Sequence, residues 1–224
     1  MSEKFSWSLE DIQIDPPEEG AMRNIEKRSP GRPKGSALNG RRRVLTDDEV
    51  RRLKAAADRD GIKYGLVVRL ILELALRSCE LVRMKVEDFN FHSSPPQVVV
   101  RGAKGGFEAT YCLPPKLALR VRRWLRLRAI DSPWLFPSRM TPDLPMTTVA
   151  VQGTFKSLCA KAKIQDRSIH DLRHTACTRM ARAGDTAIQI AHRLRHRDLR
   201  SAQTYIDFAD NAAHDRAMVS RYED

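Results

Sequence analysis

The sequence predicts a mainly helical domain with one small antiparallel sheet, an α+β fold. Helical patterns fill most of the chain after Leu45, and they are interrupted by two short apolar runs that flank a glycine-rich segment. The chain has 224 residues, which is enough for one domain with a hydrophobic core and an additional segment. We therefore expect a single helical core that carries a β-hairpin.

The first helix is expected to begin just after Leu45. Thr46 and Glu49 form the T-x-x-E pattern of a capping box, and apolar residues recur on one helical face from Val50 to Ala57. Gly61 is expected to end this helix.

A second, largely apolar helix is expected from about Tyr64 to Ser78, and its low polarity predicts a central position. Val98–Val100 and Phe107–Leu113 flank the segment 102–106, which predicts a β-hairpin with Lys104 in or beside the turn. Further helical patterns follow at 116–129, 148–162, 172–183, 186–194, 201–208 and 212–222.

The N-terminal 44 residues are expected to be a flexible arm. Residues 1–20 contain six acidic residues and one lysine, whereas residues 21–43 are basic and rich in turn-forming residues. Gly31-Arg32-Pro33-Lys34 resembles an AT-hook, although a disordered basic linker is an equally good interpretation. The expected organisation is this arm, one folded domain over 45–208, and a C-terminal helix over 209–224. The expected arm contacts to DNA are Arg32, Lys34, Arg41, Arg42 and Arg43.

The composition favours a nucleic-acid partner. Lys and Arg number 40 against 28 acidic residues, so the net charge of +12 attracts polyanions, of which double-stranded DNA is the first candidate. Membrane surfaces and acidic proteins are competing partners. The four cysteines contain no C-x-x-C pair, which fits neither a disulfide framework nor a zinc ribbon. No signal or membrane-spanning pattern is present, so we expect a cytoplasmic, nucleoid-associated protein without a membrane partner.

Two charged pairs stand out. Arg77 and Glu80 are three residues apart in an apolar stretch, so on a helix the carboxylate can orient the guanidinium; a surface ion pair is the alternative. His170 and Arg173 have the same spacing and are expected to project together from a helix start. His174 is expected to point elsewhere and to serve packing.

Together with Lys104, His196 and Tyr205, these residues can perform phosphoryl transfer without a metal. Guanidinium and imidazole groups stabilise the charge on the non-bridging oxygens of a phosphodiester, and this role is assigned to Arg77, Arg173 and His196. A phenol has a pKa of about 10 and needs a base, for which His170 is the candidate. The ammonium of Lys104 can return a proton to the departing 5′ oxygen. Attack by Tyr205 would leave a covalent phosphotyrosine link.

These residues resemble, in order and spacing, the active-site signature of the tyrosine recombinase or phage integrase family. The signature comprises Arg77 with Glu80, Lys104, His170-x-x-Arg173, His196 and Tyr205. The similarity covers about Leu45 to Asp207. It implies the family's catalytic-domain fold, site-specific DNA recombination or integration through a 3′-phosphotyrosine, no cofactor, no metal and no ATP. It also implies that 45–208 is the catalytic domain and that protomers assemble on DNA. A homotetramer is expected, in which the segment 209–224 docks on a neighbouring protomer.

The chain departs from the family pattern in two ways. Arg195 stands where the family usually has glycine, and a phosphate contact is expected for it, with a solvent-facing side chain as the alternative. The family usually has a helical clamp domain before the catalytic one, whereas 44 residues precede Leu45 here. An accessory clamp or DNA-bending protein is therefore an expected partner, and the basic arm is expected to compensate in part.

Three other functions are consistent with parts of the pattern. A DNA-binding regulator derived from a recombinase would need no intact site, and a type IB topoisomerase would use similar chemistry. A metal-dependent nuclease is prompted by His170 with His174 and by His192 with His196, both at i and i+4. The many arginines around these histidines argue against a bound cation.

Overall fold

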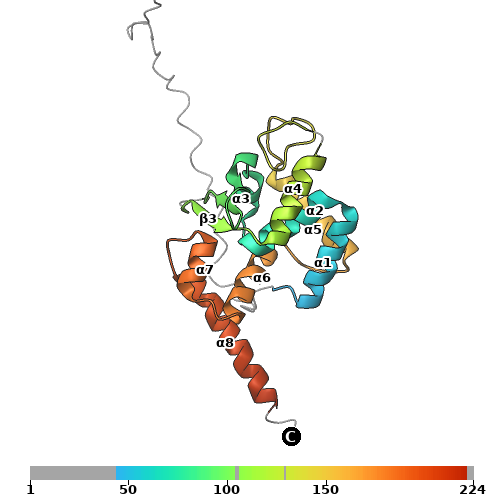
Figure 1. The fold of residues 1–224 in the computed structure, drawn as a ribbon. Helices are drawn as coiled ribbons and strands as arrows, with labels where there is room; N and C mark the ends of the chain where they lie inside the picture. The colour runs from blue at the N-terminus through green and yellow to red at the C-terminus, as the bar shows by residue number, and fades with distance from the viewer. Residues whose placement is uncertain (1–43, 104–105, 129, 221–224) are drawn as a thin grey trace, which may run out of the picture. The chain divides into compact units, whose positions relative to one another are not determined.

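The computed structural model describes residues 44–103, 106–128 and 130–220. Within this part, helices α1 (Asp47–Asp60), α2 (Ile62–Leu74), α4 (Pro115–Leu127) and α5 (Thr148–Lys161) surround the main core (Figure 1). Helices α6 (Ile169–Arg182), α7 (Ala187–Leu194) and α8 (Arg200–Ser220) form a second group. The fold is mainly helical, as the sequence predicts.

α1 begins and ends where the sequence predicts. The Thr46 hydroxyl accepts a hydrogen bond from the Glu49 amide at 3.1 Å, and the Glu49 carboxylate accepts one from the Thr46 amide at 2.8 Å. Gly61 follows the last residue of the helix with φ of 130°. The capping box thereby satisfies the backbone amides of Thr46 and Glu49 at the helix start.

The small sheet is three-stranded and antiparallel, in the order β1 (Phe89–Asn90), β2 (Gln97–Val100), β3 (Ala109–Cys112). Val98 pairs with Phe89 on one side and with Tyr111 on the other. The predicted hairpin is therefore present, and a two-residue edge strand extends it. The Tyr111 hydroxyl donates to the His192 carbonyl at 2.7 Å, which fixes the sheet against α7.

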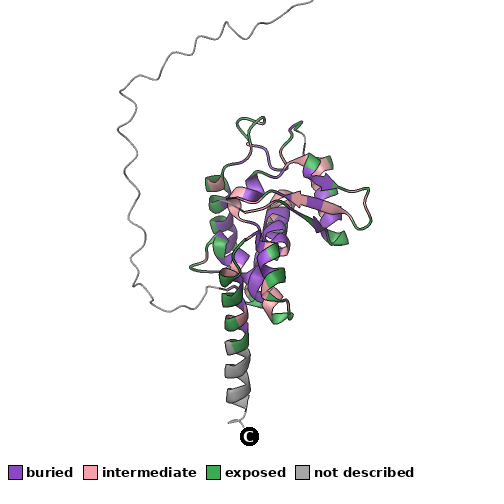
Figure 2. Cartoon of the chain, turned by 90° about the vertical axis from the view of Figure 1, so that its left-hand side faces the viewer, coloured by how far each residue is buried: buried purple, intermediate pink, exposed green. Residues whose placement is uncertain are grey.

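α2 is the central helix, because it packs against α1, α4 and α6 and is buried along most of its length (Figure 2). It ends earlier than the sequence predicts. Ala75 adopts the left-handed conformation with φ of 47°, and the chain restarts as the short helix α3 (Ser78–Val82). Arg77 and Glu80 therefore do not continue α2.

Two hydrophobic clusters meet near this break. The larger cluster joins α1, α2, α4 and α5 with the sheet, and the smaller one lies among α6, α7 and α8 and includes Ala75 and Tyr205. The two C-terminal segments predicted as separate helices form one helix, α8, which runs without a break from Arg200 to Ser220.

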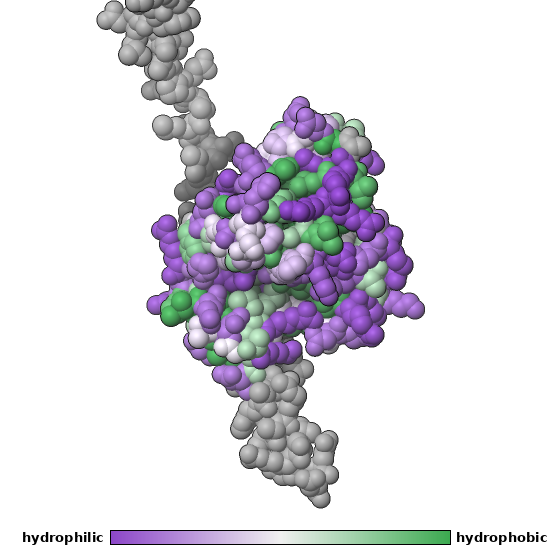
Figure 3. Space-filling view, viewed as in Figure 1, coloured by the Kyte–Doolittle hydropathy of each residue, from purple (hydrophilic) through white to green (hydrophobic). Residues whose placement is uncertain are grey.

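The face shown in Figure 3 is mainly hydrophilic, with separate apolar areas between hydrophilic side chains. Leu119 and Leu127 of α4 are among the exposed apolar residues. Over the described residues, no helix has both the length and the apolarity to cross a membrane.

Candidate active site

Arg77 and Glu80 meet through a helix cap. Arg77 precedes α3 in an extended conformation, and Glu80 is the third residue of that helix. The Glu80 carboxylate accepts from the Arg77 amide at 2.8 Å and from its Nη1 at 2.7 Å. The predicted pairing is present, but its cause is different: the carboxylate reaches back to cap the helix start, which holds the guanidinium in place.

Arg173 of α6 reaches the same carboxylate from the other side. Its Nη1 donates to the Ala75 carbonyl and lies 3.4 Å from Glu80 Oε2, while its Nη2 donates to the Leu194 carbonyl at 3.0 Å. Burial and the neighbouring charge of Arg77 lower the pKa of Arg173 to about 10. The guanidinium therefore remains charged at neutral pH.

His196 lies between the two guanidinium groups. Its Nε2 is 2.6 Å from Arg77 Nη2 and 3.2 Å from Arg173 Nη2, and its Nδ1 is 2.7 Å from the Ser201 hydroxyl. Burial, together with the charges of Arg77 and Arg173, lowers the pKa of His196 to about 4. The ring is therefore neutral at pH 7. Because guanidinium groups only donate, Nε2 is the acceptor and Nδ1 carries the proton.

Tyr205 of α8 contacts a different histidine from the one that the sequence singled out. Its hydroxyl lies 2.6 Å from His174 Nδ1, and it is 5% exposed. The prediction that His174 points elsewhere is therefore wrong. His170, Arg173 and His174 lie at i, i+3 and i+4 of α6, so the spacing that pairs His170 with Arg173 also brings His174 to that side of the helix.

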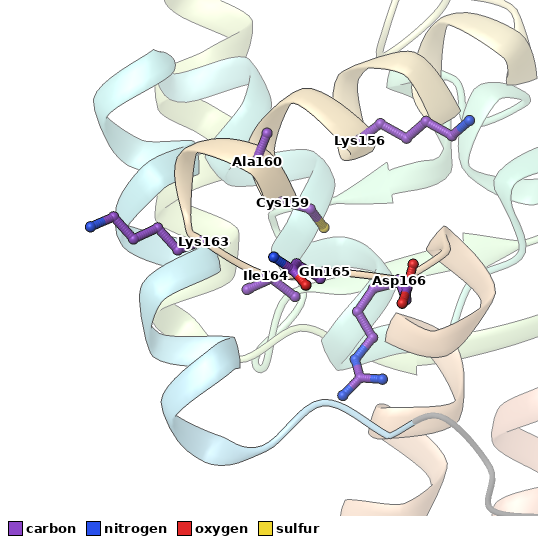
Figure 4. A pocket seen from close by; sticks show the side chains of 8 residues that line it. Lys156, Cys159, Ala160, Lys163, Ile164, Gln165 and Asp166 are labelled. Carbon is purple, nitrogen blue, oxygen red and sulfur yellow. The ribbon is translucent and has the colours of Figure 1, made fainter.

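His170 is exposed near the start of α6. It borders a hollow of about 220 Å³ that is also lined by Gln152 and Lys156 of α5. A neighbouring pocket of about 720 Å³ shares Lys156 with this hollow. Figure 4 shows Lys156 and Lys163 extending in opposite directions from that pocket. Burial raises the pKa of the Cys159 thiol in its lining to about 11, so this cysteine is not a thiolate at neutral pH.

The structure contradicts the prediction that Arg195 contacts phosphate or faces solvent, because its side chain is 0% exposed. Its Nη2 donates to Glu80 Oε2 at 2.6 Å, so the predicted phosphate contact does not agree with its position in the structure. The sequence predicts a charged residue beside the site, but it contains no signal that this side chain turns inward.

Lys104 lies outside the described residues, as do Arg32, Lys34, Arg41, Arg42 and Arg43 of the arm. Ala103 and Gly106, on the two sides of the undescribed residues 104 and 105, are described. A Cβ on Gly106 would come within 2.8 Å of the Arg195 carbonyl oxygen, so the hairpin loop packs directly against the end of α7.

The site is thus a cationic cluster with one buried acid. Three arginines contact Glu80, and the neutral ring of His196 adds no charge, so the cluster has a net positive charge suited to a phosphate group. Among the described residues, no three His, Cys, Asp or Glu side chains are grouped as metal ligands would be. His196 Nε2, which the nuclease interpretation needs for a metal, contacts guanidinium groups instead.

The comparisons with known proteins agree with one another. Residues 43–212 match the model of the phage integrase family. A tyrosine recombinase XerA from Pyrococcus furiosus is 35% identical over 162 residues, which are 72% of this chain and 56% of that protein. A tyrosine recombinase XerD from Caulobacter vibrioides is 31% identical over 185 residues, 77% of this chain and 60% of that protein.

Solved structures have the same fold. The crystal structure of XerA recombinase aligns with a TM-score of 0.67 and 26% identity, over 81% of this chain and 64% of that one. The post-cleavage complex of XerH with a palindromic difH substrate aligns with a TM-score of 0.70 and 18% identity, over 84% and 56%. The chain therefore spans about 56–60% of the length of these two curated relatives. On the family match and these identities, the chain belongs to the phage integrase family of tyrosine recombinases.

Proposed function

We propose that this chain cuts and rejoins DNA as a site-specific recombinase, with Tyr205 as the nucleophile. The observation that carries the proposal is the convergence of Arg77, Arg173 and His196 at one point, with Ser201 of α8 bound to the same histidine. Ser201 and Tyr205 are four residues apart and so share a face of α8. Tyr205, the proposed nucleophile, therefore lies one helical turn from Ser201, which contacts His196.

In the proposed reaction, the phenol oxygen of Tyr205 attacks the phosphorus of a DNA phosphodiester. The bond from phosphorus to the 5′ oxygen breaks as the 3′-phosphotyrosine bond forms. In the second step, a 5′ hydroxyl attacks the same phosphorus and releases Tyr205. Arg77 and Arg173 stabilise the charge on the non-bridging oxygens in both steps, and no external energy source is needed because one phosphoester replaces another.

The proton of Tyr205 passes, in this proposal, to a histidine of α6. His174 is in contact with the hydroxyl, which makes it the stronger candidate in this conformation. His170 precedes it by one turn and is exposed, so it stays a candidate base and phosphate ligand once DNA is bound. Lys104 is proposed to give the leaving 5′ oxygen its proton.

The partners follow from the chemistry and from the relatives. XerH is solved bound to its difH substrate, and a lambda integrase dimer is solved bound to a COC′ core site. For this chain we propose double-stranded DNA, assembly of a homotetramer on it, and an accessory DNA-bending or clamp protein. The basic arm, including Arg32, Lys34 and residues 41–43, is proposed to contact DNA, and the segment 209–224 to dock on a neighbouring protomer.

The test is a covalent adduct. The purified chain and its Tyr205→Phe variant are incubated in chelator with supercoiled and nicked DNA that carries the native site, then denatured and analysed for protein-linked DNA. We expect an adduct with the unmodified chain and none with the variant, whereas both bind DNA equally. Recombination that is unchanged in Tyr205→Phe would contradict the assignment.

The other functions give different results in the same assay. A type IB topoisomerase would form the adduct and relax supercoiled DNA without exchange of partners. A DNA-binding regulator would bind without forming an adduct. A metal-dependent nuclease would lose its activity in chelator.

A further inference from the structure

Arg195 occupies a position that is costly for an arginine in two respects. It follows the last residue of α7 in the left-handed conformation, with φ of 56°, which is unfavourable for a residue other than glycine. Its side chain is also 0% exposed, and a buried charge is unfavourable unless it is paired. An arginine at such a position needs a compensating interaction.

That compensation comes from Glu80. Arg195 Nη2 donates to Glu80 Oε2 at 2.6 Å and to the Ala75 carbonyl at 3.0 Å, while Nη1 donates to the Leu74 carbonyl at 3.2 Å and to its near neighbour Arg193 at 2.8 Å. Over the described residues, its buried Nε atom has no hydrogen-bond partner. The side chain is therefore held at the carboxylate by several contacts, and it is not in position to reach a ligand.

The carboxylate of Glu80 is shared unequally among three guanidinium groups. Arg77 holds Oε1 at 2.7 Å and Arg195 holds Oε2 at 2.6 Å, whereas Arg173 is 3.4 Å from Oε2. Burial raises the pKa of Glu80, but the hydrogen bond and charge of Arg195, helped by Arg77 and Arg173, outweigh burial and leave the pKa below its ordinary value. The acid is therefore ionised, and Arg195 is its strongest partner.

The charge balance depends on Arg195. Without Arg195, the Glu80 carboxylate would be paired with Arg77 and Arg173 alone. Its Oε2 could then move closer to Arg173 than the present 3.4 Å. The Glu80 carboxylate would then neutralise one of the two guanidinium charges that are proposed to bind phosphate. With Arg195 present, the Glu80 carboxylate has a counter-ion that is itself buried and does not contact the substrate.

We propose that Arg195 is a positioning residue: it neutralises Glu80 and so leaves the guanidinium groups of Arg77 and Arg173 available to a phosphodiester. This inference rests on the proposed function, because it assumes that the cluster binds a phosphate. It assigns a role to a residue that stands where the resembling family usually has glycine.

The experiment measures binding of inorganic phosphate to the full chain, with NMR signals of the His196 ring as the reporter and sodium chloride used to hold ionic strength constant. Arg195→Met removes the charge and keeps the length, and we expect phosphate affinity to fall about tenfold. Arg195→Lys keeps the charge and should restore affinity to within about threefold. Arg195→Gln is neutral but still donates to Glu80, so it provides a neutral variant if Arg195→Met does not fold.

Arg193→Met is the matched control, because Arg193 lies two residues before Arg195 and its guanidinium carbon is 4.6 Å from the centroid of the Tyr111 ring. It should bind phosphate like the unmodified chain. A second reading comes from the pH titration of His196. The charge of Arg195 contributes to the lowered pKa of that ring, so the titration midpoint should rise in Arg195→Met and Arg195→Gln but not in Arg193→Met.

The outcomes separate the inference from the proposed function. Unchanged phosphate affinity and an unchanged His196 midpoint in folded neutral variants would overturn the role of Arg195 and leave the recombinase proposal intact. Absence of phosphate binding in the unmodified chain would contradict the phosphate site itself, and the role of Arg195 with it. Equal losses in the Met and Lys variants would show a purely steric role and would also overturn the inference.

Discussion

The hydroxyl of Tyr205 and Nδ1 of His174 are 2.6 Å apart, and this contact joins α8 to α6 at the residue that follows Arg173. The proposed nucleophile therefore contacts the same helix that supplies Arg173, whose guanidinium is proposed to bind phosphate. A shift of α6 would move both groups together.

The contact between Tyr205 and His174 predicts which histidine controls the phenol. His174→Ala should lower the rate of covalent adduct formation by about 100-fold or more, because general-base catalysis typically contributes that much. The measurement is single-turnover adduct formation, with His170→Ala as the matched variant on the same face of α6. A full rate in His174→Ala with a large loss in His170→Ala would assign the base to His170, the residue that the sequence favoured.

The pKa of His196 predicts how stability depends on pH. In the unfolded chain this histidine binds a proton near its ordinary value of 6.5, whereas in the folded chain it does so only near 4. The contribution of His196 to the free energy of unfolding is therefore fully present above pH 6.5 and is lost as the pH falls toward 4. Because the ring is only partly buried, solvent screens much of this effect, and a difference in Tm on the order of 2–4 °C is expected.

Thermal unfolding between pH 7.5 and 4.5 measures that difference. His196→Gln should show a flatter decline in Tm than the unmodified chain. His92→Gln, a substitution of an exposed histidine, should follow the unmodified chain. Parallel curves for all three proteins would show that His196 does not titrate as described.

Two buried threonines of α6 should respond oppositely to valine. Thr175 accepts from the Leu45 amide at 2.9 Å and donates to the Asp171 carbonyl at 2.7 Å. Thr175→Val leaves the Leu45 amide without its partner and should lower the free energy of unfolding by about 1–3 kcal/mol. The Thr178 hydroxyl has no partner among the described residues, so Thr178→Val should be neutral or stabilising. Urea unfolding of both variants checks this, and equal losses would count against the hydrogen-bond assignment.

Two glycines should differ in the same way. A Cβ on Gly106 would meet the Arg195 carbonyl oxygen at 2.8 Å, so Gly106→Ala must displace the hairpin loop and should reduce adduct formation by at least about tenfold. A Cβ on Gly153 of α5 meets nothing within 4 Å. Gly153→Ala should therefore stabilise the helix by about 0.5–1 kcal/mol and leave the reaction rate unchanged. Full activity in Gly106→Ala would show that the loop does not depend on this contact.

The sequence predicted those elements whose signals are local. The capping box at Thr46 and Glu49, the end of α1 at Gly61 and the β-hairpin all depend on residues close together in the chain, and all are present. The left-handed conformation of Ala75 has no such local signal, because alanine is a strong helix former. The break in the helix depends instead on tertiary contacts, since Arg173 and Arg195 both donate to the Ala75 carbonyl.

The sequence identified a set of candidate site residues, but it did not predict which of their atoms touch. The order of residues identified Arg77, Arg173, His196 and Tyr205 as one set, but distances between separate helices decide which atoms touch. His174 was missed although it has the i+4 spacing from His170 that prompted the metal-site alternative. The inward turn of the Arg195 side chain depends on an acid more than a hundred residues away, which no local pattern encodes.

The continuity of α8 has a mechanical consequence. Ser201 holds His196 and Tyr205 contacts His174 from one helix whose backbone continues to Ser220. A force applied to the distal turns acts on a stiff lever, and rotation of that lever carries the hydroxyl and the phenol by the same angle. Release of Tyr205, the proposed nucleophile, from His174 is thereby coupled to release of His196 from Ser201, and the two contacts are expected to break together.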